Sequence, residues 1–348
     1  MKRRRFLGSV LGAVALGSHP KHTASAEESN VRVPSESLVW PIAARRRLGA
    51  PAFDGHTDTV PDIVGEIGTP PGLVIFSEGN HLMVLLSEDV LGAFPAWAKS
   101  QPQYADLDLR NIMVVTLPQP IVVQMIRAGG IALGNLSLDV SRASGFYPDA
   151  VLAGPDPLKQ LRKLAVLEPQ ARFFSKNRGR ALLVRKGNPF GIKGLADVAR
   201  TGARLAQADA IEAGARAGNR TAIEQLIGKS AAAAFFAAEV ATFPGRLGIT
   251  HRDVPEMIAR GYADVGLTQY HLISYWARTF PNLFELVAIA GSERFSVQIA
   301  FARVTKPLRP RAVNAFEEFL FSRARDVYPR YDFARMTDDE YGAVLGLD

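Results

Sequence analysis

Short apolar runs alternate with amphipathic stretches from about residue 72 to residue 328. The clearest runs are Leu73–Phe76, Ile112–Val115 and Ala150–Ala153, which are long enough for buried strands and too short for helices. The same rhythm returns in the second half, where we expect helices over 230–241, 253–261 and 311–328 and strands over 263–267, 284–290 and 295–304. Strands that alternate with helices are typical of parallel sheets covered on both faces, so we predict an α/β fold with two doubly wound units.

The first 26 residues have a different pattern. A basic start, MKRRR, precedes an apolar run from Phe6 to Gly17, which is far shorter than the roughly 20 residues needed to span a bilayer. Arg3 and Arg4, followed by one residue and then Phe6-Leu7, fit the twin-arginine export pattern, and residues 24–26, Ala-Ser-Ala, fit a cleavage site. We therefore predict that residues 1–26 are a twin-arginine signal peptide and that the mature protein is periplasmic or otherwise extracytoplasmic. The alternative is a basic helix of a cytoplasmic protein.

Replacing Arg3 and Arg4 together with lysine is expected to leave unprocessed precursor in the cytoplasm, because this export route reads the arginine pair. Cell fractionation followed by immunoblotting measures the outcome. Normal periplasmic accumulation of the double variant would contradict the assignment.

Charge and composition narrow the classes of partner. The chain has 348 residues and a formal charge of +7, but five of its cationic residues precede Glu27 with no acidic residue among them, which leaves +2 for the remainder. A nearly neutral body argues against nucleic-acid binding, which usually needs a basic stripe. There is no cysteine, so neither a disulfide nor a thiolate nucleophile is available.

Sequence motifs of catalysis and metal binding are missing. There is no G-x-S-x-G, no G-x-x-x-x-G-K-[ST], and no G-x-G-x-x-G after a strand. The six histidines are scattered, and the Asp54–Asp58 stretch lies in a Pro- and Gly-rich arm over residues 27–70, where a solvated turn is the simpler interpretation. We expect no enzymatic activity, no metal and no cofactor.

Small and neutral polar residues gather instead where predicted strands give way to helices. In open parallel sheets, ligands bind beyond the carboxyl ends of the strands, and helix N-termini there favour anions. Each such residue alone could simply cap a helix. The candidates for ligand binding are Ser77, Gly79, Asn80, Thr116, Gln119, Asn135, Ser137, Gln207, Asp209, Gln269 and Tyr270. We expect recognition mainly through neutral donors, with entry of Lys176, Arg178 or Arg180 into the site as the alternative.

Three stretches carry a resemblance to a known family. They are residues 149–189, with the run RALLVRKGNP, residues 191–226, which begin GIKGLADVARTGARLAQAD, and residues 251–270, HRDVPEMIARGYADVGLTQY. Together they resemble the periplasmic solute-binding proteins of ABC importers, in particular the molybdate/tungstate-type group. The likeness covers roughly residues 72–335. The family's late tyrosine aligns with Gln269, and Tyr270 is one place further on, while Asn80 falls near the family's first binding serine.

The resemblance implies a type 2 periplasmic-binding-protein fold, in which two lobes joined by two hinge strands close on a ligand. Residues 71–180 and 298–348 would form lobe 1 and residues 181–297 lobe 2, with crossings along 181–189 and 296–304. The implied partners are a small anionic solute, either an oxyanion or an organic anion, and a membrane permease, and we expect a monomer. The alternatives are a ligand-sensing partner of a membrane receptor and an exported enzyme on the same scaffold.

Overall fold

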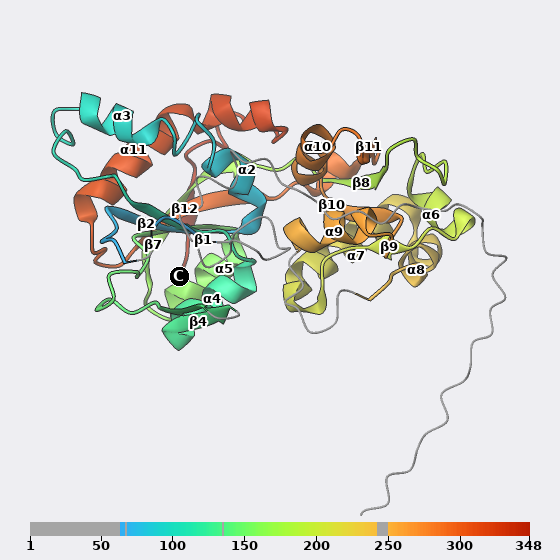
Figure 1. Cartoon of the computed structure of the whole chain (residues 1–348), viewed down its shortest axis with the longest axis horizontal. Coiled ribbons are helices and arrows are strands. Elements are labelled where there is room, and N and C mark those ends of the chain that lie inside the picture. Colours follow the sequence, from blue (N-terminus) through green and yellow to red (C-terminus); the bar gives the residue numbers. More distant parts are fainter. Residues whose placement is uncertain (1–62, 67, 134–135, 242–249) are drawn as a thin grey trace, which may run out of the picture. The chain divides into compact units, whose positions relative to one another are not determined.

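The computed structural model describes residues 63–66, 68–133, 136–241 and 250–348 (Figure 1). The predicted signal peptide, most of the predicted arm and Asn135 lie outside these ranges. Among the described helices, none combines the length and the apolar character needed to cross a membrane.

Two mixed sheets organise the described chain. The larger has the strand order β1 (Ile63–Val64), β3 (Ile112–Val115), β2 (Leu73–Ser77), β6 (Ala150–Ala153), β12 (Gln298–Val304), β7 (Leu167–Lys176) and β13 (Val344–Gly346). The smaller has the order β11 (Phe284–Ala288), β8 (Arg180–Arg185), β10 (Val265–Gln269) and β9 (Leu205–Ala206). A separate hairpin pairs β4 (Gly130–Leu133) with β5 (Leu136–Asp139). The predicted α/β class is confirmed.

Neither sheet is purely parallel, and this part of the prediction is wrong. β2 runs parallel to β3 and β6, but β12 is antiparallel to both of its neighbours, β6 and β7. In the smaller sheet β10 is parallel to β9, whereas β8 is antiparallel to β10 and β11. The reason is topological, because β8 and β12 are the strands by which the chain enters each sheet after leaving the other.

Helices cover the larger sheet on both faces (Figure 1). One face carries α4 (Gln119–Ala128) and α5 (Pro155–Lys163), and the other carries α2 (Leu82–Leu85), α3 (Phe94–Ser100) and α11 (Pro310–Val327). α2 and α3 are two separate helices, and residues 130–139 form the β4–β5 hairpin. The end of the expected arm forms β1, which pairs with β3.

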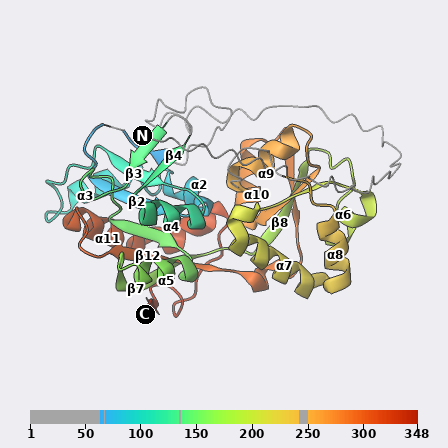
Figure 2. The same ribbon diagram turned by 90° about the horizontal axis from the view of Figure 1, so that it is seen from below.

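The smaller sheet is covered in the same way. Its strands pack on one face against α6 (Leu195–Thr201), α7 (Ala213–Ile227) and α8 (Lys229–Ala237), and α7 and α8 lie next to each other in Figure 2. The other face packs against α9 (Thr250–Ala259) and α10 (Tyr270–Thr279). Leu182 and Val184 of β8 belong to the first cluster and Ala181 and Leu183 to the second, as the two-residue period of a strand requires.

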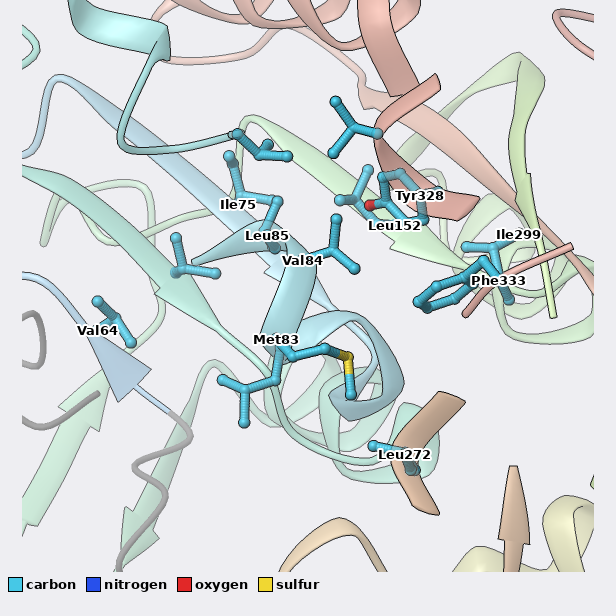
Figure 3. Packing of buried hydrophobic residues seen from close by; sticks show 14 of the residues in the cluster. Val64, Ile75, Met83, Val84, Leu85, Leu152, Leu272, Ile299, Tyr328 and Phe333 are labelled. Carbon is cyan, nitrogen blue, oxygen red and sulfur yellow. The ribbon is translucent and has the colours of Figure 1, made fainter. Parts of the chain in front are cut away.

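One hydrophobic cluster contains residues from both sheets and their helices. Figure 3 shows part of it, with Val84 and Leu85 of α2 among Ile75 and Leu152 of the larger sheet, and with Leu272 of α10 in the same cluster. Continuous apolar burial of this kind stabilises contact between the two sheet units without relying on the polar edges of the sheets.

The chain passes between the sheets twice, over 177–179 and over 289–297. β8 lies wholly in the smaller sheet, and β12 lies wholly in the larger. The expected crossings, 181–189 and 296–304, therefore contain the strands that follow the two passages. Asn177 ties the two passages together, because its Oδ1 accepts from the backbone N–H groups of Gly179 at 3.1 Å and Val297 at 3.0 Å. Gly179 has a φ of 76°, and a side chain there would collide with the carbonyl of Ser292.

Candidate functional site

The larger sheet changes winding direction between β2 and β6. The connection after β2 passes over the α2 and α3 face, whereas α5, after β6, lies on the opposite face. Such a switch point leaves a crevice beyond the carboxyl ends of the two strands, where ligands bind in open α/β sheets. The narrow crevice at this place is too small to hold a water molecule, and it is lined by Glu78, Gln119, Val122, Val123, Val151, Leu152, Ala153, Pro157 and Leu161.

Glu78 is the charged group of this crevice. Its side chain is only 5% exposed, and its backbone N–H donates to the Leu152 carbonyl at 3.0 Å. Its Oε1 accepts from Asn80 Nδ2 at 3.3 Å and lies 3.5 Å from His81 Nε2. No group in the described part of the chain donates to its Oε2.

Two contacts join this edge of the larger sheet to helices of the smaller one. Gly79, in the 3-10 turn Gly79–His81, lies so close to His251 of α9 that a Cβ at position 79 would collide with the imidazole ring, and it would lie 2.9 Å from the Thr116 carbonyl oxygen. His271 of α10 donates from Nε2 to the Asn80 carbonyl at 3.1 Å. Glycine at position 79 is therefore required for this close approach.

His271 is buried and held neutral. Burial lowers the pKa of His271 well below its usual value, and the nearby charge of His81 lowers it further, although the bond to the Asn80 carbonyl opposes the change. Its ring stacks on Phe333 with a centroid distance of 3.8 Å, and its Nδ1 has no partner in the described chain. The neighbouring His81 has its Nδ1 3.1 Å from the Tyr328 hydroxyl.

A pH dependence follows from His271. Because its pKa is depressed in the folded protein, the unfolded chain takes up the proton first, and stability falls as pH drops below about 6.5. Between pH 7.5 and pH 5.5 this one group should cost about 1.4 kcal/mol of unfolding free energy. Urea denaturation of the wild type and of His271→Gln at both pH values measures the difference. An equal loss in both proteins would show that His271 does not titrate in this way.

The edge of the smaller sheet carries a chain of buried polar groups. Arg180, at the start of β8, donates from Nε to Asn219 Oδ1 of α7 at 2.6 Å, and Asn219 Nδ2 donates to Gln207 Oε1 at 3.1 Å. Gln207 in turn donates to Glu239 at 2.8 Å, and Glu239 is paired with Arg216. Arg180 is paired in register with Gln269, so both side chains belong to the α7 face.

Arg180 differs from the other cations near the edge. It is 5% exposed, and its described partners are neutral, namely Asn219, the Phe295 carbonyl at 3.4 Å and, through its backbone N–H, Ser292 Oγ. Burial lowers the pKa of Arg180 to about 10, so the group stays protonated at neutral pH. A buried charge without an opposite charge is energetically costly.

Lys176 and Arg178 already have acidic neighbours. Lys176 donates to Glu340 at 2.6 Å, and Arg178 lies 3.9 Å from Asp332, with its guanidinium over the Tyr270 ring. Of the three cations considered from the sequence, Arg180 is therefore the one suited to meeting an anion from outside the chain.

The structure divides the candidate residues between the two edges. Thr116 follows β3 and is fully buried, and its hydroxyl has no described partner. Gln119 lines the crevice. The Ser77 hydroxyl donates to the Glu78 carbonyl. On the smaller sheet, Gln269 Oε1 is buried without a described partner. Asp209 precedes the 3-10 turn Ala210–Glu212, and its backbone carbonyl accepts from the Glu212 N–H. Tyr270 begins α10. Ser137 is exposed on the separate hairpin and is not brought to either edge.

The sequence pattern gives no signal for Glu78, Glu212 or the histidines, and it favours neutral donors over Arg180. Glu78 stands between the candidates Ser77 and Gly79, but a single acidic residue in the sequence has no pattern that would mark it as part of a site. His251 approaches Gly79 from α9, and its neighbour Thr250 donates from its hydroxyl to Glu212 Oε1 at 2.7 Å. Among the described residues, no group of three or more His, Cys, Asp or Glu could hold a metal ion.

Two mixed α/β sheets joined by two passages of the chain are the architecture of the type 2 periplasmic-binding-protein fold. The sequence profile of the bacterial extracellular solute-binding proteins matches residues 119–331, and the chain belongs to this family. Among curated protein sequences, none matches the chain significantly.

Solved structures support the fold. The sulfate-binding protein SubI from Mycobacterium tuberculosis H37Rv superimposes with a TM-score of 0.51 at 14% identity, over 76% of this chain and 87% of that one. L-phospholactate-bound PEB3, a protein from Campylobacter jejuni, gives a TM-score of 0.51 at 15% identity, over 76% and 100%. A periplasmic thiamin binding protein gives 0.50 at 11%, over 76% and 83%. The comparisons establish the wider family and not the molybdate/tungstate group.

Proposed function

We propose that this protein is the solute receptor of an ABC importer and captures a small anion between two lobes. Lobe 1 is the larger sheet with its helices, and lobe 2 is the smaller sheet with its helices. Membership of the solute-binding family supports the binding role, and two structural neighbours, a sulfate-binding protein and a phospholactate-bound protein, are compatible with an anion as the ligand. The role is binding and delivery rather than catalysis.

The observation that carries the proposal is the buried guanidinium of Arg180 among neutral partners. Taking a cation out of water costs several kcal/mol unless an opposite charge compensates it. Asn219 holds the guanidinium in place through Nε, and Gly218 leaves room for it, because a Cβ there would lie 2.9 Å from Nη2. An anionic ligand at this edge would supply the missing charge, and Gln269, whose amide belongs to the same face, could donate to it.

Closure explains how residues of both lobes would act together. The contacts of Gly79 with His251 and of Asn80 with His271 join the two edges, so a ligand that touches both binds the closed arrangement better. That differential affinity is what would shift the protein towards closure. We revise the expectation of neutral recognition accordingly: neutral donors orient the ligand, and Arg180 supplies the charge.

A thermal-shift screen of the protein lacking residues 1–26 tests this proposal. The panel contains inorganic oxyanions and small organic acids, with thiamin and neutral sugars as controls. An anion present at 100 times its dissociation constant should stabilise the protein by about 2.7 kcal/mol. Stabilisation by the cationic or neutral solutes alone would overturn the anion assignment.

A further inference from the structure

A chain of hydrogen bonds runs from Arg180 to Glu239 through two buried amides. Asn219 is 4% exposed and Gln207 is 5% exposed. Asn219 Oδ1 accepts from Arg180 Nε at 2.6 Å, and Asn219 Nδ2 donates to Gln207 Oε1 at 3.1 Å. Gln207 Nε2 donates to Glu239 Oε2 at 2.8 Å, and the same carboxylate accepts two hydrogen bonds from Arg216. The chain of groups therefore has an arginine at each end.

The chemistry of these groups fixes how both amides are turned. A guanidinium can only donate hydrogen bonds, and a carboxylate can only accept them. The two ends of an amide have almost the same shape, so its partners decide which end points where. Glu239 takes the donating end of Gln207, which turns the oxygen of Gln207 towards Asn219. The oxygen of Asn219 is then left for Arg180. Without a member that only accepts, a chain between two arginines would set a donor against a donor at one link.

The backbone holds Glu239 at its distance from Arg180. Glu239 lies opposite Leu205 of β9 in a parallel bridge. The Leu205 N–H donates to the Ala238 carbonyl at 2.8 Å, and the Val240 N–H donates to the Leu205 carbonyl at 2.9 Å. The acid is thus anchored to the sheet at a place where two neutral amides separate it from the buried guanidinium.

This separation leaves the charge of Arg180 available to a ligand. Asn219 accepts from Nε, and the Phe295 carbonyl accepts from Nη1, so the other N–H groups of Nη1 and Nη2 have no acceptor in the described chain. A carboxylate at position 219 would hold the guanidinium equally well, but it would compensate the charge, as Asp332 does for Arg178. A neutral oxygen fixes the geometry without competing with an anion.

We propose that Asn219 determines the charge selectivity of the site, because its neutral amide, oriented by Glu239 through Gln207, holds the Arg180 guanidinium and leaves its charge for the ligand. This inference rests on the proposed function. Asn219 and Glu239 act through Arg180 and are positioning residues. Moving the acid from position 239 to position 219 should keep the net charge and every link of the chain, and yet it should impair anion binding.

The double variant Asn219→Asp/Glu239→Gln makes this move. The new carboxylate accepts from Arg180 and Gln207, and the new amide donates to Gln207 and accepts from Arg216. Glu239→Gln alone is the intermediate. It should bind within about threefold of the wild type, because Arg180 still orients Asn219 and the conflict between donors falls on Arg216, whose side chain is 33% exposed and can turn to water.

Thermal melting without ligand and isothermal titration calorimetry with inorganic sulfate and inorganic phosphate test the inference. Adding Asn219→Asp to Glu239→Gln should raise the melting temperature, because a buried cation gains an opposite charge, and should weaken anion binding at least about tenfold. A merely structural role of Asn219 would move stability and affinity in the same direction. Asn314→Asp is the matched control, since Asn314 of α11 also accepts from an arginine, Arg303, but in lobe 1. It should bind like the wild type.

Two results would overturn the inference. One is a step to Asn219→Asp that leaves the affinity unchanged, and the other is a step that lowers the melting temperature. The second result counts whether or not the two probes bind, because melting is measured without ligand. The proposed function is judged separately, since it falls only if no anion in the wider thermal-shift screen stabilises the protein.

Discussion

Replacing Arg180 with glutamine is expected to weaken anion binding by about 30- to 700-fold and to leave the ligand-free protein at least as stable as before. Losing one partner of a buried charge pair costs about 2–4 kcal/mol, and 1.4 kcal/mol corresponds to a factor of ten in affinity. Stability should not suffer, because the variant removes a buried cation whose described partners are neutral.

Calorimetry gives the affinity and thermal melting gives the stability of this variant. Arg200→Gln is the matched control, because it removes the same charge from an exposed side chain on α6 that is paired with Asp197. The control should bind like the wild type. Equal affinity in both variants, or an Arg180→Gln protein that melts much earlier yet binds normally, would mean that the guanidinium has a structural role instead.

Gly79→Ala is expected to weaken ligand binding by at least about tenfold, because it blocks closure. The new Cβ would collide with the His251 ring and press on the Thr116 carbonyl, and the easiest relief is for the lobes to stay apart. The fold should survive, since His251 comes from α9 and not from the sheet that carries Gly79. Gly346→Ala, with no atom near its added Cβ, should bind normally.

Small-angle scattering with saturating ligand measures closure in these variants. The wild type and Gly346→Ala should contract, and Gly79→Ala should not. Adding His251→Ala to Gly79→Ala removes the ring from the collision and should restore part of the contraction. Contraction of Gly79→Ala to the wild-type extent would show that position 79 is not in contact across the closed lobes.

Much of the strand and helix pattern could be predicted from the sequence because burial is local and periodic. Leu73–Phe76 and Ala150–Ala153 are apolar without interruption because both of their faces are covered, and the structure buries every one of these residues. Strand direction is a different matter. The antiparallel entry of β8 and β12 depends on where the chain comes from, and no periodicity records that.

The candidate site was predictable to the level of its loops. Position after a strand identified Gly79, Asn80, Thr116 and Gln119, and these residues do lie at one edge of the larger sheet. What the sequence could not provide was the pairing of charges. Arg178 and Arg180 look alike in the sequence, and only the fold gives one of them Asp332 and leaves the other with Asn219.

The central claim is that an anion is held between the two lobes with its charge at Arg180. A crystal structure of the protein lacking residues 1–26, bound to the anion with the largest thermal shift, tests it most directly. We predict an anionic group within hydrogen-bond distance of the Arg180 guanidinium, with further contacts from residues of both sheet edges. A ligand that contacts one lobe only, or that leaves Arg180 with its present neutral partners, would contradict the account.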